Sequence, residues 1–116
     1  MYAVIADWAT GGEDTRNYDE ISRRMGFDDD PPAGLVAHAA GATPEGGFRI
    51  VGLWETREAF EEFRSERLEP TAHAVISALP PERQAASGPP ELTIYPVHHA
   101  LVASESSTRL PSGSRT

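Results

Sequence analysis

Residues 34–70 constrain the fold of this chain more than any other segment. Two apolar runs, residues 35–40 and 48–54, flank a Thr-Pro-Glu-Gly-Gly cluster, in which proline presets one turn dihedral and glycine allows a positive φ. This pattern predicts a β-hairpin. Thr56 then stands where a helix N-cap is expected, and Phe60 begins an apolar stripe at helical spacing. The segment therefore predicts strand, turn, strand and amphipathic helix, in that order.

An earlier strand and helix precede the hairpin. Residues 2–8 are apolar and rich in β-forming side chains, which predicts a first buried strand. Tyr18, Ile21 and Met25 recur at helical spacing, and Gly26 follows where a left-handed C-cap would end the helix. The spacing predicts a helix between residues 14 and 25.

Prolines punctuate the second half of the chain. Pro70 interrupts the helix that starts near residue 57, so a kink or break is expected there, with a second helical piece ending at Pro80. Residues 92–102 predict a last strand. Pro96 lies inside it, which implies an edge position, a bulge or the start of a second short segment.

The chain length suits one domain. At 116 residues the chain can bury a modest core, which we assign to residues 1–103. Residues 104–116 are small and polar, and they are expected to form a flexible C-terminal tail.

The order β, α, β, β, α, β predicts an α+β fold of the ferredoxin-like type: an antiparallel four-stranded sheet with two helices on one face. The predicted central strands are apolar at nearly every position, including Ile5, Val51 and Leu53. Both of their faces should therefore be buried, although the helices cover only one. We expect a second copy to cover the other face, which makes the protein a homodimer.

Charge and composition exclude several partners. The formal net charge is −8, without a basic cluster, which argues against nucleic acid and anionic membranes as partners. No apolar run approaches the ~20 residues that span a bilayer. The sequence has no cysteine, which is compatible with a reducing compartment. The expected location is cytoplasmic.

Four segments of the sequence resemble a known family: GLVAHAAG, the glycine-containing hairpin, FRIVGLWETREAFEEFRSERLEP and YPVHHALV. They are similar to dimeric α+β barrel proteins of the antibiotic biosynthesis monooxygenase type, particularly small actinobacterial members. The similarity covers roughly residues 2–102, and its most specific part is the Trp54-Glu55-Thr56 run before the helix. The resemblance implies the dimeric α+β barrel fold.

The family resemblance also implies a range of activities: cofactor-independent oxygenation of polycyclic aromatic substrates, cyclisation or isomerisation, and haem degradation, besides members without assigned activity. Trp54 matches the tryptophan that lines the pocket of the oxygenase members. The chain departs from the oxygenase pattern because its only asparagine, Asn17, is far from Trp54 in sequence. We also find no aligned asparagine and histidine of the haem-degrading branch.

Histidines are the natural acid–base candidates in a chain without cysteine. His38 lies between two alanines on the predicted second strand and is our first candidate for a pocket-facing general base. His98 is the second catalytic candidate, and it could approach His38 across a dimer. His98 and His99, as neighbours on a strand, should point to opposite faces, so they make a poor metal clamp. The alternative for each is a hydrogen-bonded structural or interface role.

Other side chains complete the predicted site. Tyr95 is a catalytic candidate that could donate a hydrogen bond or proton to a bound carbonyl, the alternative being half-buried packing. Trp54, Phe63 and His73 are predicted to bind substrate. The alternatives are core packing for the aromatic residues and surface exposure for His73.

These observations predict an enzyme that acts on a hydrophobic, aromatic or polyketide-like molecule between sheet and helices. The reaction would be oxygenation, cyclisation or isomerisation by histidine acid–base chemistry, without a metal, flavin or other cofactor. The alternative is a non-catalytic ligand-binding or stress-associated dimer with the same pocket.

Overall fold

The computed structural model describes residues 1–85 and 88–103. The core domain predicted for residues 1–103 falls almost entirely within them. The predicted C-terminal tail, residues 104–116, lies outside the described residues.

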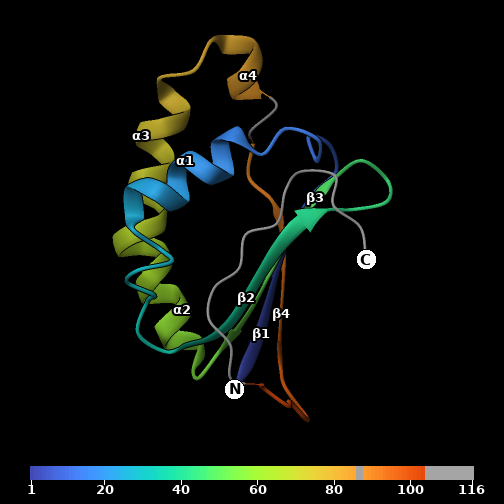
Figure 1. The fold of residues 1–116 in the computed structure, drawn as a ribbon, viewed down its shortest axis with the longest axis vertical. Coiled ribbons are helices and arrows are strands. Elements are labelled where there is room, and N and C mark those ends of the chain that lie inside the picture. Colours follow the sequence, from blue (N-terminus) through green and yellow to red (C-terminus); the bar gives the residue numbers. More distant parts are fainter. Residues whose placement is uncertain (86–87, 104–116) are drawn as a thin grey trace.

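The strands form one antiparallel sheet with the order β2-β3-β1-β4 (Figure 1). The bounds are β1, Tyr2–Trp8; β2, Leu35–Ala42; β3, Phe48–Trp54; and β4, Glu91–Pro96. The two strands predicted to be apolar on both faces, β1 and β3, are the inner pair. This confirms the ferredoxin-like α+β fold.

The helices cover one side of the sheet (Figure 1). They are α1, Arg16–Met25; α2, Arg57–Phe63; α3, Glu69–Ser77; and the short α4, Pro81–Ala85; a π-helical turn, Arg64–Leu68, joins α2 to α3. The short helix α4 lies in the polar segment between Pro80 and the last strand. None of the helices in the described part of the chain has the length and apolar character needed to cross a bilayer.

Helix ends follow the predicted signals. Thr56 caps α2, because its Oγ1 accepts a hydrogen bond from the backbone N–H of Ala59 at 3.0 Å. Gly26 ends α1 in the left-handed conformation, with φ at 65°, and its N–H bonds to the carbonyl oxygen of Arg23. Both ends are thus set by local sequence.

The helical segment does not break at Pro70. The N–H of Glu69 bonds to the carbonyl oxygen of Arg64, five residues back, as in a π turn. Pro70 falls in the first turn of α3, the part of a helix in which proline is tolerated. The wider turn lets α2 run directly into α3, so the helical segment is continuous where a kink or a break was expected, and the predicted break does not occur.

The last strand is shorter than predicted. β4 ends at Pro96, whereas the sequence indicated a strand to residue 102, and the N–H of Val97 bonds to the carbonyl oxygen of Met1. Proline has no N–H to extend the ladder, so the edge strand stops there. The prediction that His98 and His99 lie on a strand was therefore wrong.

The core lies between the sheet and the helices. Val4 and Trp54 from the sheet pack against Phe27, Phe60 and Phe63. No helix of the described residues lies over the opposite face of the sheet (Figure 1). The residues on this face are mostly apolar and partly buried, among them Ile5, Ala37, Val51 and Leu53. Asp7 and Arg49 form an ion pair near one end of the face.

Candidate functional site

A cavity of about 600 Å³ separates the sheet from the helices. This volume falls within the range of ~300–1,000 Å³ that is usual for small-molecule sites. Its walls are largely apolar and come from α1, the sheet, α2, the π turn and α3, among them Trp8, Ile21, Phe48, Ile50, Leu68 and Ile76. The cavity can therefore hold a hydrophobic molecule of aromatic size.

His38 and Tyr18 form a polar pair inside this apolar cavity. His38 lies on β2 opposite Gly52 of β3, and Tyr18 reaches it from α1. The Tyr18 hydroxyl and the His38 Nε2 are 2.6 Å apart, a short hydrogen bond in a half-buried position. The Phe27 ring meets the imidazole edge to face, with centroids 4.6 Å apart. The imidazole is thus held in one place with a hydroxyl partner.

Trp54 forms part of the cavity wall and is only 4% exposed. Its ring packs against Phe60 and Phe63, with centroids 5.6 and 5.4 Å away. The indole lies over Gly52: a Cβ built on that glycine would stand 2.8 Å from the indole nitrogen. Across the described residues, the indole N–H meets no hydrogen-bond acceptor, so it can donate to an occupant of the cavity.

Three predicted site residues, His38, Trp54 and Phe63, line this one cavity. Phe63 does so from the last position of α2, where it is buried against Trp54 and Phe27. They come together because they point to the helix side of the sheet or to the sheet side of the helix.

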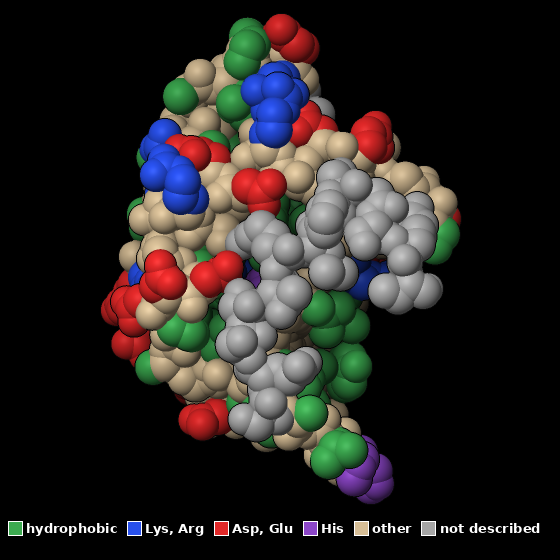
Figure 2. Space-filling model, viewed as in Figure 1, with side chains coloured by type: hydrophobic (Ala, Val, Ile, Leu, Met, Phe, Trp, Pro, Cys, Tyr) green, Lys and Arg blue, Asp and Glu red, His purple; other side chains and the backbone are tan. Residues whose placement is uncertain are grey.

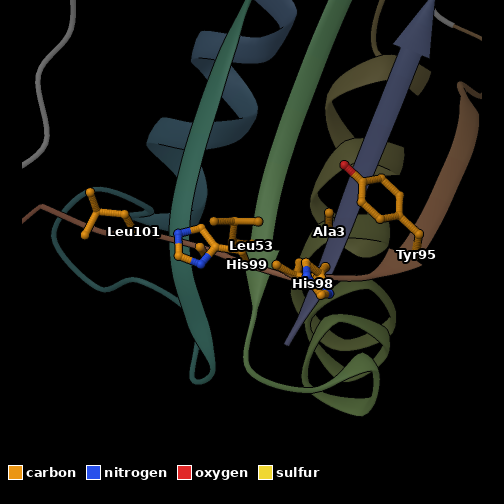
Figure 3. A pocket seen from close by; sticks show the side chains of 8 residues that line it. Ala3, Leu53, Tyr95, His98, His99 and Leu101 are labelled. Carbon is orange, nitrogen blue, oxygen red and sulfur yellow. The ribbon is translucent and has the colours of Figure 1, made fainter.

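Tyr95 and His98 lie on the other face of the sheet. They line a separate hollow of about 420 Å³ with Ala3, Leu53, His99 and Leu101 (Figure 3). His98 and His99 both border this hollow. The expectation that they point to opposite faces was wrong because the chain has left the strand at Pro96. Within one subunit, His38 and His98 do not share a site.

His73 is exposed on α3 and lies outside the lining of the cavity. Its backbone carbonyl accepts a hydrogen bond from the Ser77 hydroxyl, and its side chain faces solvent. Substrate binding by His73 stays a prediction.

Sequence reasoning missed Tyr18 and Arg83, both of which line the cavity. Tyr18 was counted only as an apolar member of the α1 stripe. The apolar stripe of α1 must face the sheet, and Tyr18 is the residue on it that carries a hydroxyl; this was the signal that could have identified Tyr18 as a site residue. Arg83 belongs to the polar segment after Pro80, and no local pattern marks it.

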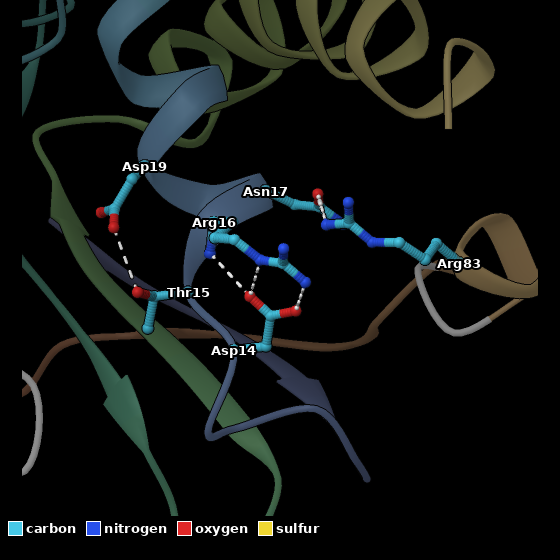
Figure 4. Close-up of polar contacts among 6 residues, drawn as sticks. All are labelled: Asp14, Thr15, Arg16, Asn17, Asp19 and Arg83. Carbon is cyan, nitrogen blue, oxygen red and sulfur yellow. Dashed lines mark hydrogen bonds and ion pairs between the residues drawn. The ribbon is translucent and has the colours of Figure 1, made fainter. Parts of the chain in front are cut away.

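The charged groups around the cavity are mostly paired (Figure 4). Asp14 receives the Arg16 guanidinium on both oxygens, at 2.9 and 2.7 Å, and these hydrogen bonds hold the pKa of Asp14 well below its usual range. Arg64 pairs with Glu61 at 3.2 Å. On the helical part of the face shown in Figure 2, basic side chains lie beside acidic ones.

Within the described ranges, residues 1–85 and 88–103, no group of three acidic or histidine side chains is arranged to hold a metal ion. The polar groups of the cavity include the histidine–tyrosine pair, the indole N–H, the uncharged side chains of Thr10, Asn17 and Ser22, and the charged rim.

The fold matches solved structures at low sequence identity. A monooxygenase from the gene ActVA-Orf6 of Streptomyces coelicolor, in complex with nanaomycin D, gives a TM-score of 0.58 at 17% identity, covering 89% of this chain and 92% of that one. SnoaB, a cofactor-independent oxygenase from Streptomyces nogalater, gives 0.55 at 13% identity, covering 86% and 94%. A Nitrosomonas europaea protein proposed to be an antibiotic biosynthesis monooxygenase gives 0.60 at 14% identity, covering 85% and 100%.

No protein-family model matches the sequence, and no curated protein matches it significantly. The structural matches confirm, at the level of the fold, the resemblance to antibiotic biosynthesis monooxygenase-like proteins that the sequence indicated over roughly residues 2–102.

Proposed function

We propose that the protein is an enzyme that binds a hydrophobic, aromatic or polyketide-like molecule between sheet and helices and oxygenates it without a cofactor. The observation that supports this most is the His38–Tyr18 pair, because it is an acid–base pair enclosed by apolar walls. Trp54 and Phe63 would position the ring system of the substrate.

The proposed chemistry begins with a proton. His38 takes it from an acidic C–H of the substrate, and Tyr18 donates a hydrogen bond to the oxygen on which negative charge develops. The resulting carbanion supplies the electrons that bind dissolved O₂, forming a C–O bond. Loss of water from that peroxide breaks the O–O bond and leaves a carbonyl. One oxygen atom enters the substrate, the other becomes water with the two hydrogens of the oxidised methylene, and all four electrons come from the substrate.

Two structural neighbours support the choice of reaction. One is titled a monooxygenase with bound nanaomycin D, and another a cofactor-independent oxygenase. Cyclisation or isomerisation would use the same proton abstraction without oxygen, so oxygen consumption separates these reactions. The proposed location is the cytoplasm, with which a chain without cysteine is compatible.

We further propose that the protein works as a homodimer packed through the open face of the sheet. That face presents Ile5, Val51 and Leu53 without cover from a helix, and Leu101 beside it is 91% exposed. Tyr95 and His98 border the same face, so their predicted catalytic role depends on the second copy.

Oxygen uptake with anthrone, a tricyclic carbon acid, tests the proposed reaction. H38Q retains an amide that can bond to Tyr18 but cannot accept the proton, so we expect the rate to fall by ~10²-fold or more. Y18F removes only the hydroxyl and should lower the rate less. Anthrone binding, followed by tryptophan fluorescence, should persist in both variants.

The non-catalytic alternative predicts a different pattern. A protein that only stores or senses its ligand would bind anthrone without consuming oxygen, and H38Q would change affinity alone. Binding of anthrone without oxygen consumption would overturn the proposed oxygenation. An H38Q variant that changes affinity alone would overturn the role of His38 as the base.

A further inference from the structure

The rim of the cavity holds an arginine for which the described residues provide no carboxylate partner. Arg83 of α4 is half-buried and lines the cavity, and its Nη2 donates to the Asn17 Oδ1 of α1 at 3.0 Å (Figure 4). In the part of the chain that the structure describes, Arg83 takes part in no ion pair. Arg64, the other arginine on the cavity wall, pairs with Glu61 and, more loosely, with Glu69.

The acidic groups close to Arg83 do not neutralise it. Asp14 lies near enough for the charge of Arg83 to help lower its pKa, but both Asp14 oxygens accept hydrogen bonds from Arg16. Glu82 is exposed and adjacent to Arg83 in a helical segment, where neighbouring positions point in different directions. The Asp14–Arg16 pair is neutral as a whole, so Arg83 contributes a positive charge at the rim.

The remaining guanidinium donors suit a planar acceptor. An arginine has five N–H donors in a rigid fork that matches a carboxylate with two parallel hydrogen bonds. The bond to Asn17 fixes the side chain between α1 and α4, which reduces the freedom that binding would cost. Asn17 therefore acts as a positioning residue for Arg83.

We propose that Arg83 recognises a carboxylate carried by the ligand, so that the ligand of this cavity is an aromatic acid rather than a neutral polycycle. The inference rests on the proposed function, since it takes the cavity as the ligand site. The aromatic body of the ligand lies against the apolar walls and its acid group lies at the rim.

Paired probes test this assignment. Naphthalene-2-carboxylate and naphthalene-2-carboxamide share a ring system and differ in charge, and quenching of Trp8 and Trp54, which both line the cavity, reports their binding. In the wild type the acid should bind about tenfold more tightly than the amide. In R83Q this preference should disappear, while the affinity for the amide stays as in the wild type and shows that the variant is folded.

R23Q is the control, because it removes one positive charge from α1 at a position outside the cavity wall. It should keep the preference for the acid. A wild-type protein that binds both probes equally, or an R83Q variant that still prefers the acid, would overturn the role of Arg83 and leave the cavity as a ligand site. If neither probe binds the wild type, the proposed ligand site fails, and this inference fails with it.

Discussion

At the scale of single residues, Gly52 determines where the Trp54 ring can lie. The glycine sits on β3 opposite His38, and the indole covers it so closely that a Cβ would meet the indole nitrogen at 2.8 Å. Because Gly52 has no side chain, the Trp54 ring can lie over β3, and space is left beside His38.

Gly52→Ala should destabilise the protein by ~1–3 kcal/mol, because the added methyl forces the buried indole or the strand to move. Gly41→Ala on β2 is the matched control, since a Cβ there meets nothing within 4 Å. Urea unfolding measures both changes. Equal stabilities for the two variants would show that Trp54 does not depend on this contact.

The residue scale is also where the site could be predicted only in part. His38, Trp54 and Phe63 share a face because strand alternation and helix periodicity place them there, and both patterns are visible in sequence. On β4, Ile94 packs against the core, and its neighbour Tyr95 points to the opposite face of the sheet. Which of the two points inward depends on the register of β4 against β1, which the sequence does not show. Arg83 reaches Asn17 through a tertiary contact that no local pattern encodes.

At the scale of elements, local signals worked where a single residue type decides the backbone. The hairpin, the Thr56 cap and the Gly26 stop follow directly from side-chain chemistry. The prolines were harder, because a missing N–H can be accommodated in several ways. In the structure a π turn precedes Pro70, and β4 ends at Pro96. Arg64 and Leu68, at the ends of that π turn, line the cavity, so the irregularity shapes the site.

Helix α1 carries an ion-pair cluster that makes stability depend on pH. Glu20 accepts hydrogen bonds from Arg23 and Arg24, which lower its pKa from 4.5 to about 2. A carboxyl whose pKa is lower in the folded than in the unfolded state stabilises the fold above the unfolded pKa, and this contribution is lost as pH falls through the folded pKa.

E20Q should therefore have a slightly lower Tm than the wild type at pH 7. The difference should shrink as pH falls from 4.5 toward 2, because the wild-type carboxylate becomes protonated in that window. The effect is small since the cluster is exposed to solvent. Thermal unfolding followed by circular dichroism at several pH values measures it. A Tm difference that stays constant across this window would contradict the assignment.

At the scale of the whole molecule, the apolar open face of the sheet is the surface through which we propose that two copies of the chain pack. Light scattering should find a dimer at micromolar concentration. Val51→Glu puts a charge in the middle of that face and should give a folded monomer, since a charge buried at the interface lacks a counter-ion. Ala74→Glu on the exposed side of α3 adds the same charge and should leave the dimer intact. A monomeric wild type, or a V51E variant that remains dimeric, would disprove this interface.

The central claim is that the cavity between sheet and helices binds the ligand, and ligand affinity tests this claim most directly. Ala72 and Ala74 lie two positions apart on α3; Ala72 lines the cavity and Ala74 faces solvent. The measurement is the dissociation constant of anthrone, from tryptophan fluorescence, for the wild type, A72F and A74F. We predict saturable binding that is weakened at least ~10-fold in A72F, where a ring occupies ligand space, and unchanged in A74F. Equal affinity in all three proteins, or no binding by the wild type, would contradict the account.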